Sequence, residues 1–109
     1  MIKFIKTKDA IIREIAKTYK ISNLLTVKDS KNISVAIGRA ENHTEITKNT
    51  QSDRVYYVLN GTLIVNKIEN KAGDVVFVPK GTEYEFGGTF EAVVINSPAF
   101  NPQVEIVSS

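Results

Sequence analysis

The alternation of apolar and polar residues along most of this chain predicts short β-strands. Runs rich in valine, isoleucine and tyrosine recur roughly every 8–12 residues between Gly, Pro, Asn and Asp, which is typical of a β-sandwich or barrel. We expect strands at residues 33–37, 55–59, 62–65, 75–78, 84–86 and 92–95. The predicted fold class is therefore all-β, and the 109 residues are expected to form one domain.

Turn-forming residues indicate where these strands end. Asn60-Gly61 lies between two of them and predicts a type I′ hairpin, because both residues tolerate a positive φ. Asn42-His43 is expected to form another turn, which places His43 on the surface. Ala72-Gly73-Asp74 and Pro79-Lys80-Gly81 bound the strand between them.

The N-terminal segment contains the one stretch with helical periodicity. Asp9 is a candidate N-cap, and apolar side chains then fall on one stripe. These residues are Ile11, Ile12, Ile15, Ala16 and Tyr19. Two short strands explain the same residues, so helix and strand pair are both open.

Several predicted strands are apolar on both faces, unlike a strand that is buried on one side only. This holds for residues 55–59, 75–78 and 92–95. The outer face must then be covered by the N-terminal segment or by a second copy of the chain. Because the N-terminal segment is rich in lysine, we expect a homodimer.

Composition excludes several functions. The net charge of +2 comes from 14 basic and 12 acidic residues spread along the chain, which argues against nucleic acid as a partner. The absence of cysteine excludes disulfides, thiolate chemistry and Cys-based zinc sites. No apolar run approaches the ~20 residues that cross a bilayer, and the N-terminus does not resemble a signal peptide. We therefore expect no membrane association and a cytoplasmic location.

Two blocks resemble the paired motifs of the cupin superfamily. The first motif ends with a glutamate, six residues and a glycine, and residues 54–61 keep this spacing with Arg54 at the glutamate position. The second motif is matched from Gly73 to Tyr84, with Tyr84 in place of its histidine. The resemblance covers about residues 33–96. It implies a cupin-type double-stranded β-helix, the RmlC-like jelly-roll barrel, preceded by the N-terminal segment.

The resemblance also implies where a metal would bind, and the residues there do not suit one. The family's two histidine positions fall on Lys48 and Thr50, or on Thr47 and Asn49 if one more residue intervenes. Arginine and lysine repel a divalent ion and have no free lone pair near neutral pH, whereas the family's ligands are His and Glu. We expect neither a metal nor another cofactor.

Residues two apart in a strand point to the same face, so the inward direction of these positions predicts which other residues line the cavity. The expected ligand-binding residues are Lys48, Thr50, Arg54, Tyr56, Tyr84 and Phe86. The neighbouring acids Asp53, Glu83 and Glu85 fall on the opposite face. Because an unpaired buried charge is costly, two cations without an internal acid indicate a small anionic ligand that carries a carboxylate or phosphate.

Three functions are compatible with this lining. The first is a metal-free barrel that binds a small anion. The second is a metal-independent isomerase, epimerase or lyase acting on a sugar-derived or other anionic substrate. The third is a structural or partner-binding barrel. Cupin-like sugar epimerases pair a tyrosine with a His–Asp dyad, and the motifs of this chain contain no candidate for that dyad, so the sequence leaves open whether the protein is an enzyme.

Overall fold

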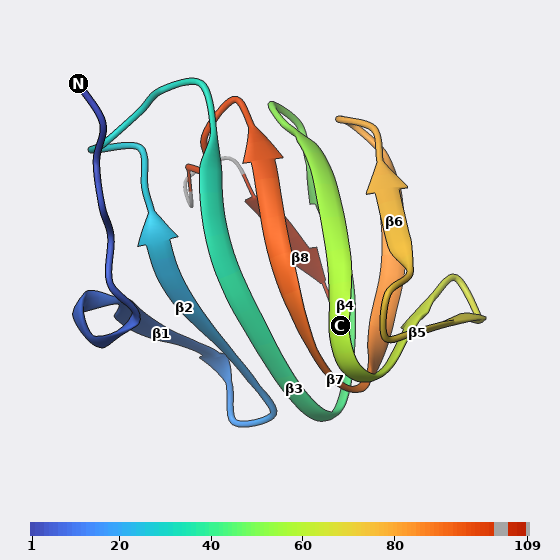
Figure 1. The fold of residues 1–109 in the computed structure, drawn as a ribbon. Coiled ribbons are helices and arrows are strands. Elements are labelled where there is room, and N and C mark those ends of the chain that lie inside the picture. The colour runs from blue at the N-terminus through green and yellow to red at the C-terminus, as the bar shows by residue number, and fades with distance from the viewer. Residues whose placement is uncertain (102–104, 109) are drawn as a thin grey trace.

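The protein is an antiparallel β-structure that closes around one core (Figure 1). It was analysed as a computed structural model, which describes residues 1–101 and 105–108. The elements are η1 (Thr7–Asp9), β1 (Ile11–Ala16), β2 (Tyr19–Leu25), β3 (Ser34–Asn49), β4 (Asp53–Val65), β5 (Ile68–Lys71), β6 (Val75–Val78), β7 (Glu83–Ser97) and β8 (Glu105–Ser108). The all-β jelly-roll prediction is confirmed, and no helix among the described residues is long and apolar enough to cross a membrane.

Strand β7 is central, since it pairs with β3 on one side and with β4 on the other. The strand order is β1-β2-β3-β7-β4-β5, while β6 also pairs with β4 and β8 with β3. The β3–β7 register shifts between Ala40 and His43, and the β4–β7 register shifts between Val58 and Asn60. Such β-bulges bend long strands and thereby allow the sheet to curl around its contents.

The helix considered for the N-terminal segment is wrong, and the strand pair is correct. Strands β1 and β2 form a hairpin, with Arg13 opposite Ile21, and β2 continues the sheet beside β3. The isoleucine-rich sequence fits a strand, because β-branched side chains pack well on a pleated surface. Pairing with β3 also satisfies the backbone hydrogen-bonding groups of β2.

Both Asn-containing turns predicted from the sequence are wrong. Strand β4 continues through Asn60-Gly61, and Gly61 (φ 76°) pairs with Phe90 of β7. A Cβ on Gly61 would collide with the Thr89 carbonyl. The hairpin turn lies instead at Asn66 and Lys67, which have φ values of 48° and 70°. A residue with positive φ serves a bulge as well as a turn, and pairing with the distant β7 decides which one forms.

Aromatic side chains fill one end of the core. The ring of Phe86 contacts those of Tyr19, Tyr56, Tyr84 and Phe90, at centroid distances between 5.4 and 6.4 Å. These residues come from β2, β4 and β7, so the cluster ties the N-terminal hairpin to the two long strands. Their burial removes a large apolar area from water and supports the closed sheet.

The outer face of the sheet carries two rows of apolar side chains across four strands. The rows run Phe77, Val55, Ile95, Val35 and Val75, Tyr57, Val93, Ile37. Within the chain, Val75, Phe77 and Tyr57 remain 61%, 60% and 42% exposed. The N-terminal hairpin extends the sheet beyond β3 at its edge (Figure 1).

We propose that a second copy of the chain covers these rows. Neither row contains a charged residue, so a two-fold pairing of like patches is favoured over a charged partner. The change Tyr57→Asp would bury an uncompensated carboxylate in that interface and should convert a dimer to a monomer. Light scattering at micromolar concentration measures this, with Gln51→Asp on the exposed β3–β4 turn as the control. A wild-type mass near the 12.1 kDa of one chain would contradict the proposal.

Candidate functional site

The barrel contains a partly open cavity of about 190 Å³. Apolar side chains such as Ile15, Ile21, Leu25 and Val94 form part of its wall. The polar groups that reach it include Arg13, Asn23, Glu45, Arg54 and Asn96. An apolar cavity with a few placed polar groups is typical of a small-molecule site.

One wall of the cavity is a hydrogen-bonded row that starts at Asn96 and ends at Tyr56. The Arg54 guanidinium donates from Nε to Asn96 Oδ1 (2.7 Å) and from Nη1 to the Tyr84 hydroxyl (3.0 Å). The Tyr84 and Tyr56 hydroxyls are 2.5 Å apart. Arg54 and Asn96 are direct partners in the β4–β7 ladder, so the register itself places these two side chains together. The bonds hold the guanidinium in a fixed orientation at the cavity.

A second guanidinium approaches from the N-terminal hairpin. The Cζ atoms of Arg13 and Arg54 lie 4.9 Å and 5.7 Å from the centroid of the Phe100 ring. Both distances allow a cation–π interaction. Phe100, which follows β7, thus brings together two cations from opposite parts of the chain at the cavity wall.

A buried acid and imidazole lie on β3. His43 Nε2 is 2.8 Å from Glu45 Oε1, and His43 Nδ1 is 2.8 Å from Thr18 Oγ1. The His43 ring stacks on Tyr19 at 4.9 Å between centroids. Gly87 pairs with Thr44, the residue after His43, and any Cβ on Gly87 would overlap the His43 carbonyl, so glycine is required for this close approach of β7 to β3.

The expected surface position of His43 is therefore wrong, because the residue is only 5% exposed. The reason is the bulge at Asn42 (φ 48°), which shifts the alternation of β3 by one residue. From His43 onward the odd-numbered residues face the interior, including Glu45, Thr47 and Asn49. The internal acid that the sequence was expected to lack is thus Glu45, which is 8% exposed and lines the cavity.

The predicted ligand-binding residues separate into two groups. Arg54, Tyr56 and Phe86 line the cavity, and Tyr84 lies behind them in contact with Arg54 and Tyr56. In the described part of the chain, neither Lys48 nor Thr50 lines the cavity, and Thr50 is exposed. Their expected inward orientation is wrong because the bulge selects the other register. As expected, the acids at 53, 83 and 85 are exposed.

Sequence reasoning missed several polar residues of the lining, namely Arg13, Asn23, Thr26, Ser34, Glu45 and Asn96. The orientation of Glu45 relative to His43 was predictable, because residues two apart in a strand share a face. The inward orientation of Asn96 was also predictable, because it continues the alternation of β7 after Phe90, Ala92 and Val94. Arg13 had no such signal, because its segment was compatible with both a helix and a strand, and Asn23 had none, because no strand was predicted there.

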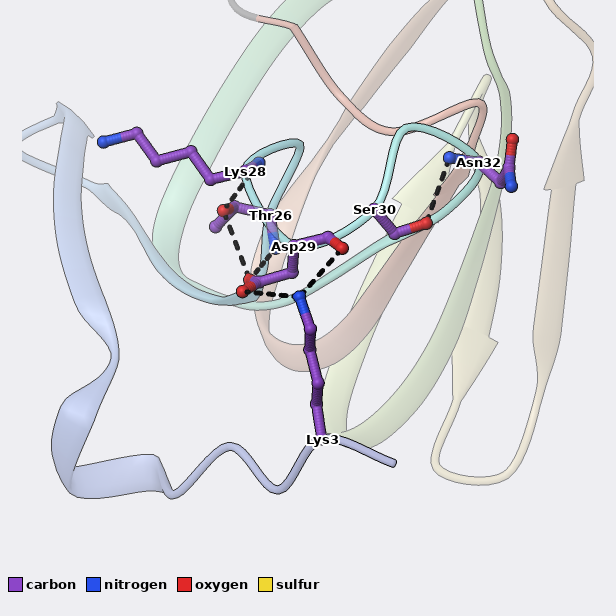
Figure 2. A network of polar contacts seen from close by, with 6 residues as sticks. All are labelled: Lys3, Thr26, Lys28, Asp29, Ser30 and Asn32. Carbon is purple, nitrogen blue, oxygen red and sulfur yellow. Dashed lines mark hydrogen bonds and ion pairs between the residues drawn. The ribbon is translucent and has the colours of Figure 1, made fainter. Parts of the chain in front are cut away.

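The loop between β2 and β3 closes one side of the cavity with Thr26. Asp29 Oδ2 accepts hydrogen bonds from the Thr26 backbone nitrogen (3.1 Å) and hydroxyl (3.4 Å). Lys3 Nζ donates to the Asp29 carbonyl (3.1 Å) and lies 3.8 Å from its carboxylate (Figure 2). The N-terminal segment is thereby fastened to the loop that borders the cavity.

The metal that the fold family implies does not fit these residues. The inward positions that correspond to the family's ligands hold Thr47, Asn49, Arg54 and Tyr84. The guanidinium points its N–H donors at Tyr84 and Asn96, and it offers no lone pair. Among the described residues, no three His, Cys, Asp or Glu side chains are grouped so that they could hold an ion.

Burial raises the pKa of Tyr56 well above its ordinary value of 10.0. The neighbouring Tyr84 raises this pKa further, while the Arg54 guanidinium lowers it. Desolvation is the largest of these effects, so Tyr56 remains a neutral phenol near neutral pH. In this form it can donate a hydrogen bond or a proton into the cavity.

The raised pKa of Tyr56 predicts a loss of stability at alkaline pH. Tyr56 contributes fully below pH 10.0, and the contribution falls above it because the unfolded chain releases the proton first. Denaturant unfolding between about pH 8 and 11 should show a smaller pH dependence for Tyr56→Phe than for the wild type. Equal slopes for wild type and Tyr56→Phe would refute the assignment.

Comparison with known proteins gives one family and many similar folds. The family described as ethanolamine utilisation protein EutQ matches residues 6–99, whereas no curated protein matches the chain. A putative ethanolamine utilization protein Q from Salmonella typhimurium LT2 is 29% identical over 75% of this chain and 71% of its own, with a TM-score of 0.67.

Two further structures are similar in fold. Pac13, described as a unique nucleoside dehydratase, is 22% identical over 99% of this chain and 92% of its own, with a TM-score of 0.82. Streptomyces Pac13 variants with uridine, two Tyr-to-Phe and one His-to-Gln, also align. Oxalate decarboxylase from Bacillus subtilis aligns at 14% identity over 97% of this chain and 32% of its own, with a TM-score of 0.80. The match over most of its length and the observed fold show that this chain belongs to the EutQ family, within the cupin superfamily.

Proposed function

We propose that the protein binds a small organic molecule bearing a carboxylate or phosphate inside the barrel, without a metal. The observation that carries this proposal is the convergence of the Arg13 and Arg54 guanidinium groups at the cavity, with their Cζ atoms 4.9 and 5.7 Å from the centroid of the Phe100 ring. A guanidinium binds carboxylate and phosphate through two parallel hydrogen bonds, and these charge-assisted bonds are stronger than neutral ones.

The cavity also limits the size and character of the ligand. Its volume of about 190 Å³ lies below the ~300–1,000 Å³ of drug-sized sites. The apolar wall around Ile15, Ile21 and Val94 favours a ligand with a hydrocarbon or ring portion opposite its anionic group. Because Asn96 and Tyr84 already orient the Arg54 guanidinium, little side-chain entropy is lost when the anion binds.

The family description mentions ethanolamine, but the charge of the site argues against free ethanolamine as the ligand. Ethanolamine is a cation at neutral pH, and the two guanidinium groups outnumber the one carboxylate of the lining, Glu45, so a further positive charge is disfavoured. Ethanolamine is therefore a useful negative control in a ligand screen. Nucleosides and nucleotides belong in the same screen because variants of the similarly folded Pac13 were solved with uridine.

Loss of the Arg54 guanidinium should weaken binding of the anionic ligand. A thermal-shift screen of carboxylates, phosphates, nucleosides and ethanolamine identifies the best binder, since ligand at 100 times Kd stabilises by ~2.7 kcal/mol. Calorimetry should then show affinity for that binder reduced about tenfold or more in Arg54→Met. Arg39→Met is the matched control, because Arg39 is an exposed arginine paired with Glu91. Unchanged affinity in Arg54→Met would place the anion elsewhere.

A second function, a metal-independent isomerase or lyase, is favoured by the buried His43–Glu45 pair. Glu45 lines the cavity and His43 holds its carboxylate from behind, while the neutral Tyr56 phenol lines the same cavity. In such a reaction Glu45 would take a proton from a carbon beside a carbonyl. The electron pair left on the ligand then forms a C=C bond, and a departing hydroxyl takes the Tyr56 proton and leaves as water.

The change Glu45→Gln separates catalysis from binding. Glutamine keeps the size and can still hydrogen-bond His43, but it cannot accept the proton, so exchange of ligand C–H for deuterium should fall about 100-fold or more. Proton NMR in D₂O with uridine and with keto and hydroxy acids measures this exchange, and affinity should remain within a few-fold. The exposed Glu83→Gln is the control. Exchange at the wild-type rate in Glu45→Gln would exclude Glu45 as the base.

A further inference from the structure

Three hydrogen-bonded side chains cross the wall of the barrel from solvent to the cavity. Thr18 Oγ1 lies 2.8 Å from His43 Nδ1, and His43 Nε2 lies 2.8 Å from Glu45 Oε1. Thr18 occupies the exposed turn between β1 and β2, His43 is buried, and Glu45 lines the cavity. The row therefore joins water outside the barrel to the carboxylate inside it.

The surroundings fix this row in place. The Glu41 backbone nitrogen donates to the Thr18 carbonyl (2.9 Å), which fastens the β1–β2 turn to β3. The His43 ring stacks on Tyr19 at 4.9 Å and contacts Phe86 at 5.6 Å, and the Tyr19 and Phe86 rings are themselves 5.4 Å apart. These ring contacts and the two hydrogen bonds keep the His43 nitrogens aimed at Thr18 and Glu45, so a proton passes through the ring by a change of tautomer rather than by rotation.

We propose that Thr18 and His43 carry protons between solvent and Glu45, an inference that rests on the role of Glu45 as a base. With the carboxylate ionised, His43 Nε2–H donates to Glu45, and Nδ1 accepts from the Thr18 hydroxyl. With Glu45 protonated, its O–H donates to Nε2, and Nδ1–H donates to Thr18. Both arrangements satisfy every hydrogen bond of the row, because a hydroxyl can donate or accept.

The transfer balances in either direction. In the outward direction the proton on Glu45 passes to His43 Nε2 while the Nδ1 proton leaves to the Thr18 oxygen, and the Thr18 hydroxyl proton goes to water. The carboxylate is then ionised, and His43 has changed from the Nδ1–H to the Nε2–H tautomer. The reverse steps bring one proton from water to Glu45 and restore the first tautomer. Such an exit is needed because a ligand that fills the cavity blocks the direct contact of the 8%-exposed Glu45 with water.

The single histidine of the chain makes this row directly measurable. With ¹⁵N-labelled histidine, NMR of the ligand-free protein reports which ring nitrogen carries a proton and how fast that proton exchanges with water. The near-isosteric change Thr18→Val removes the hydroxyl and should slow the exchange by about tenfold or more. Thr18→Ser retains the hydroxyl and should exchange at the wild-type rate. Thr44→Val, on the exposed side of β3 next to His43, is the control and should leave the rate unchanged.

Each outcome decides the proposal. Wild-type exchange in Thr18→Val, or equal slowing in Thr18→Val and Thr18→Ser, would overturn the relay. A wild-type ring protonated on both nitrogens at neutral pH would also overturn it, because Nδ1 could not accept from Thr18; this holds even if Thr18→Val fails to fold. Since no ligand is present, failure of the relay is distinct from failure of Glu45 as a base, which the deuterium exchange of Glu45→Gln reports.

Discussion

Strand β7 hydrogen-bonds to β3 on one side and to β4 on the other, and this double pairing decides which side chains face the interior. The ladder places Asn96 beside Arg54 and Gly87 beside the backbone that follows His43. Each ladder contains one bulge, and each bulge reverses the alternation of its strand. The inward positions of Glu45, Arg54 and Asn96 and the apolar outer rows follow from these two registers.

The interior charges are tolerated because the structure surrounds them with partners. Burying an ionised group costs several kcal/mol unless hydrogen bonds compensate for the lost water. Asn96 and Tyr84 satisfy Arg54 in part, and His43 satisfies Glu45. The two networks approach the cavity from different strands, which gives it cationic, acidic and phenolic groups within one apolar shell.

Relative to the metal-binding cupins that its motifs resemble, this chain retains the turns and replaces the ligands. Gly73, Pro79 and Gly81 keep the spacing that bounds β6, whereas Arg54 and Tyr84 occupy positions that a metal would need as anionic or imidazole donors. These replacements hydrogen-bond to each other instead. At these positions, hydrogen-bonding side chains thus stand where the family's metal ligands would be.

The sequence by itself determined the all-β class, the motif spacing and the inward direction of Arg54, Tyr56, Tyr84 and Phe86. These depend on local rules, because turn residues and the two-residue period of a strand are readable without knowing its partner. Only the tertiary structure decided that Asn42 and Gly61 form bulges rather than turns, since pairing with β7 selects between these uses of a positive φ. That choice turned His43 and Glu45 inward and Lys48 outward, and it created the acid-bearing cavity. The place of Arg13 was likewise decided by long-range packing, because its approach to Phe100 depends on contacts between the two ends of the chain.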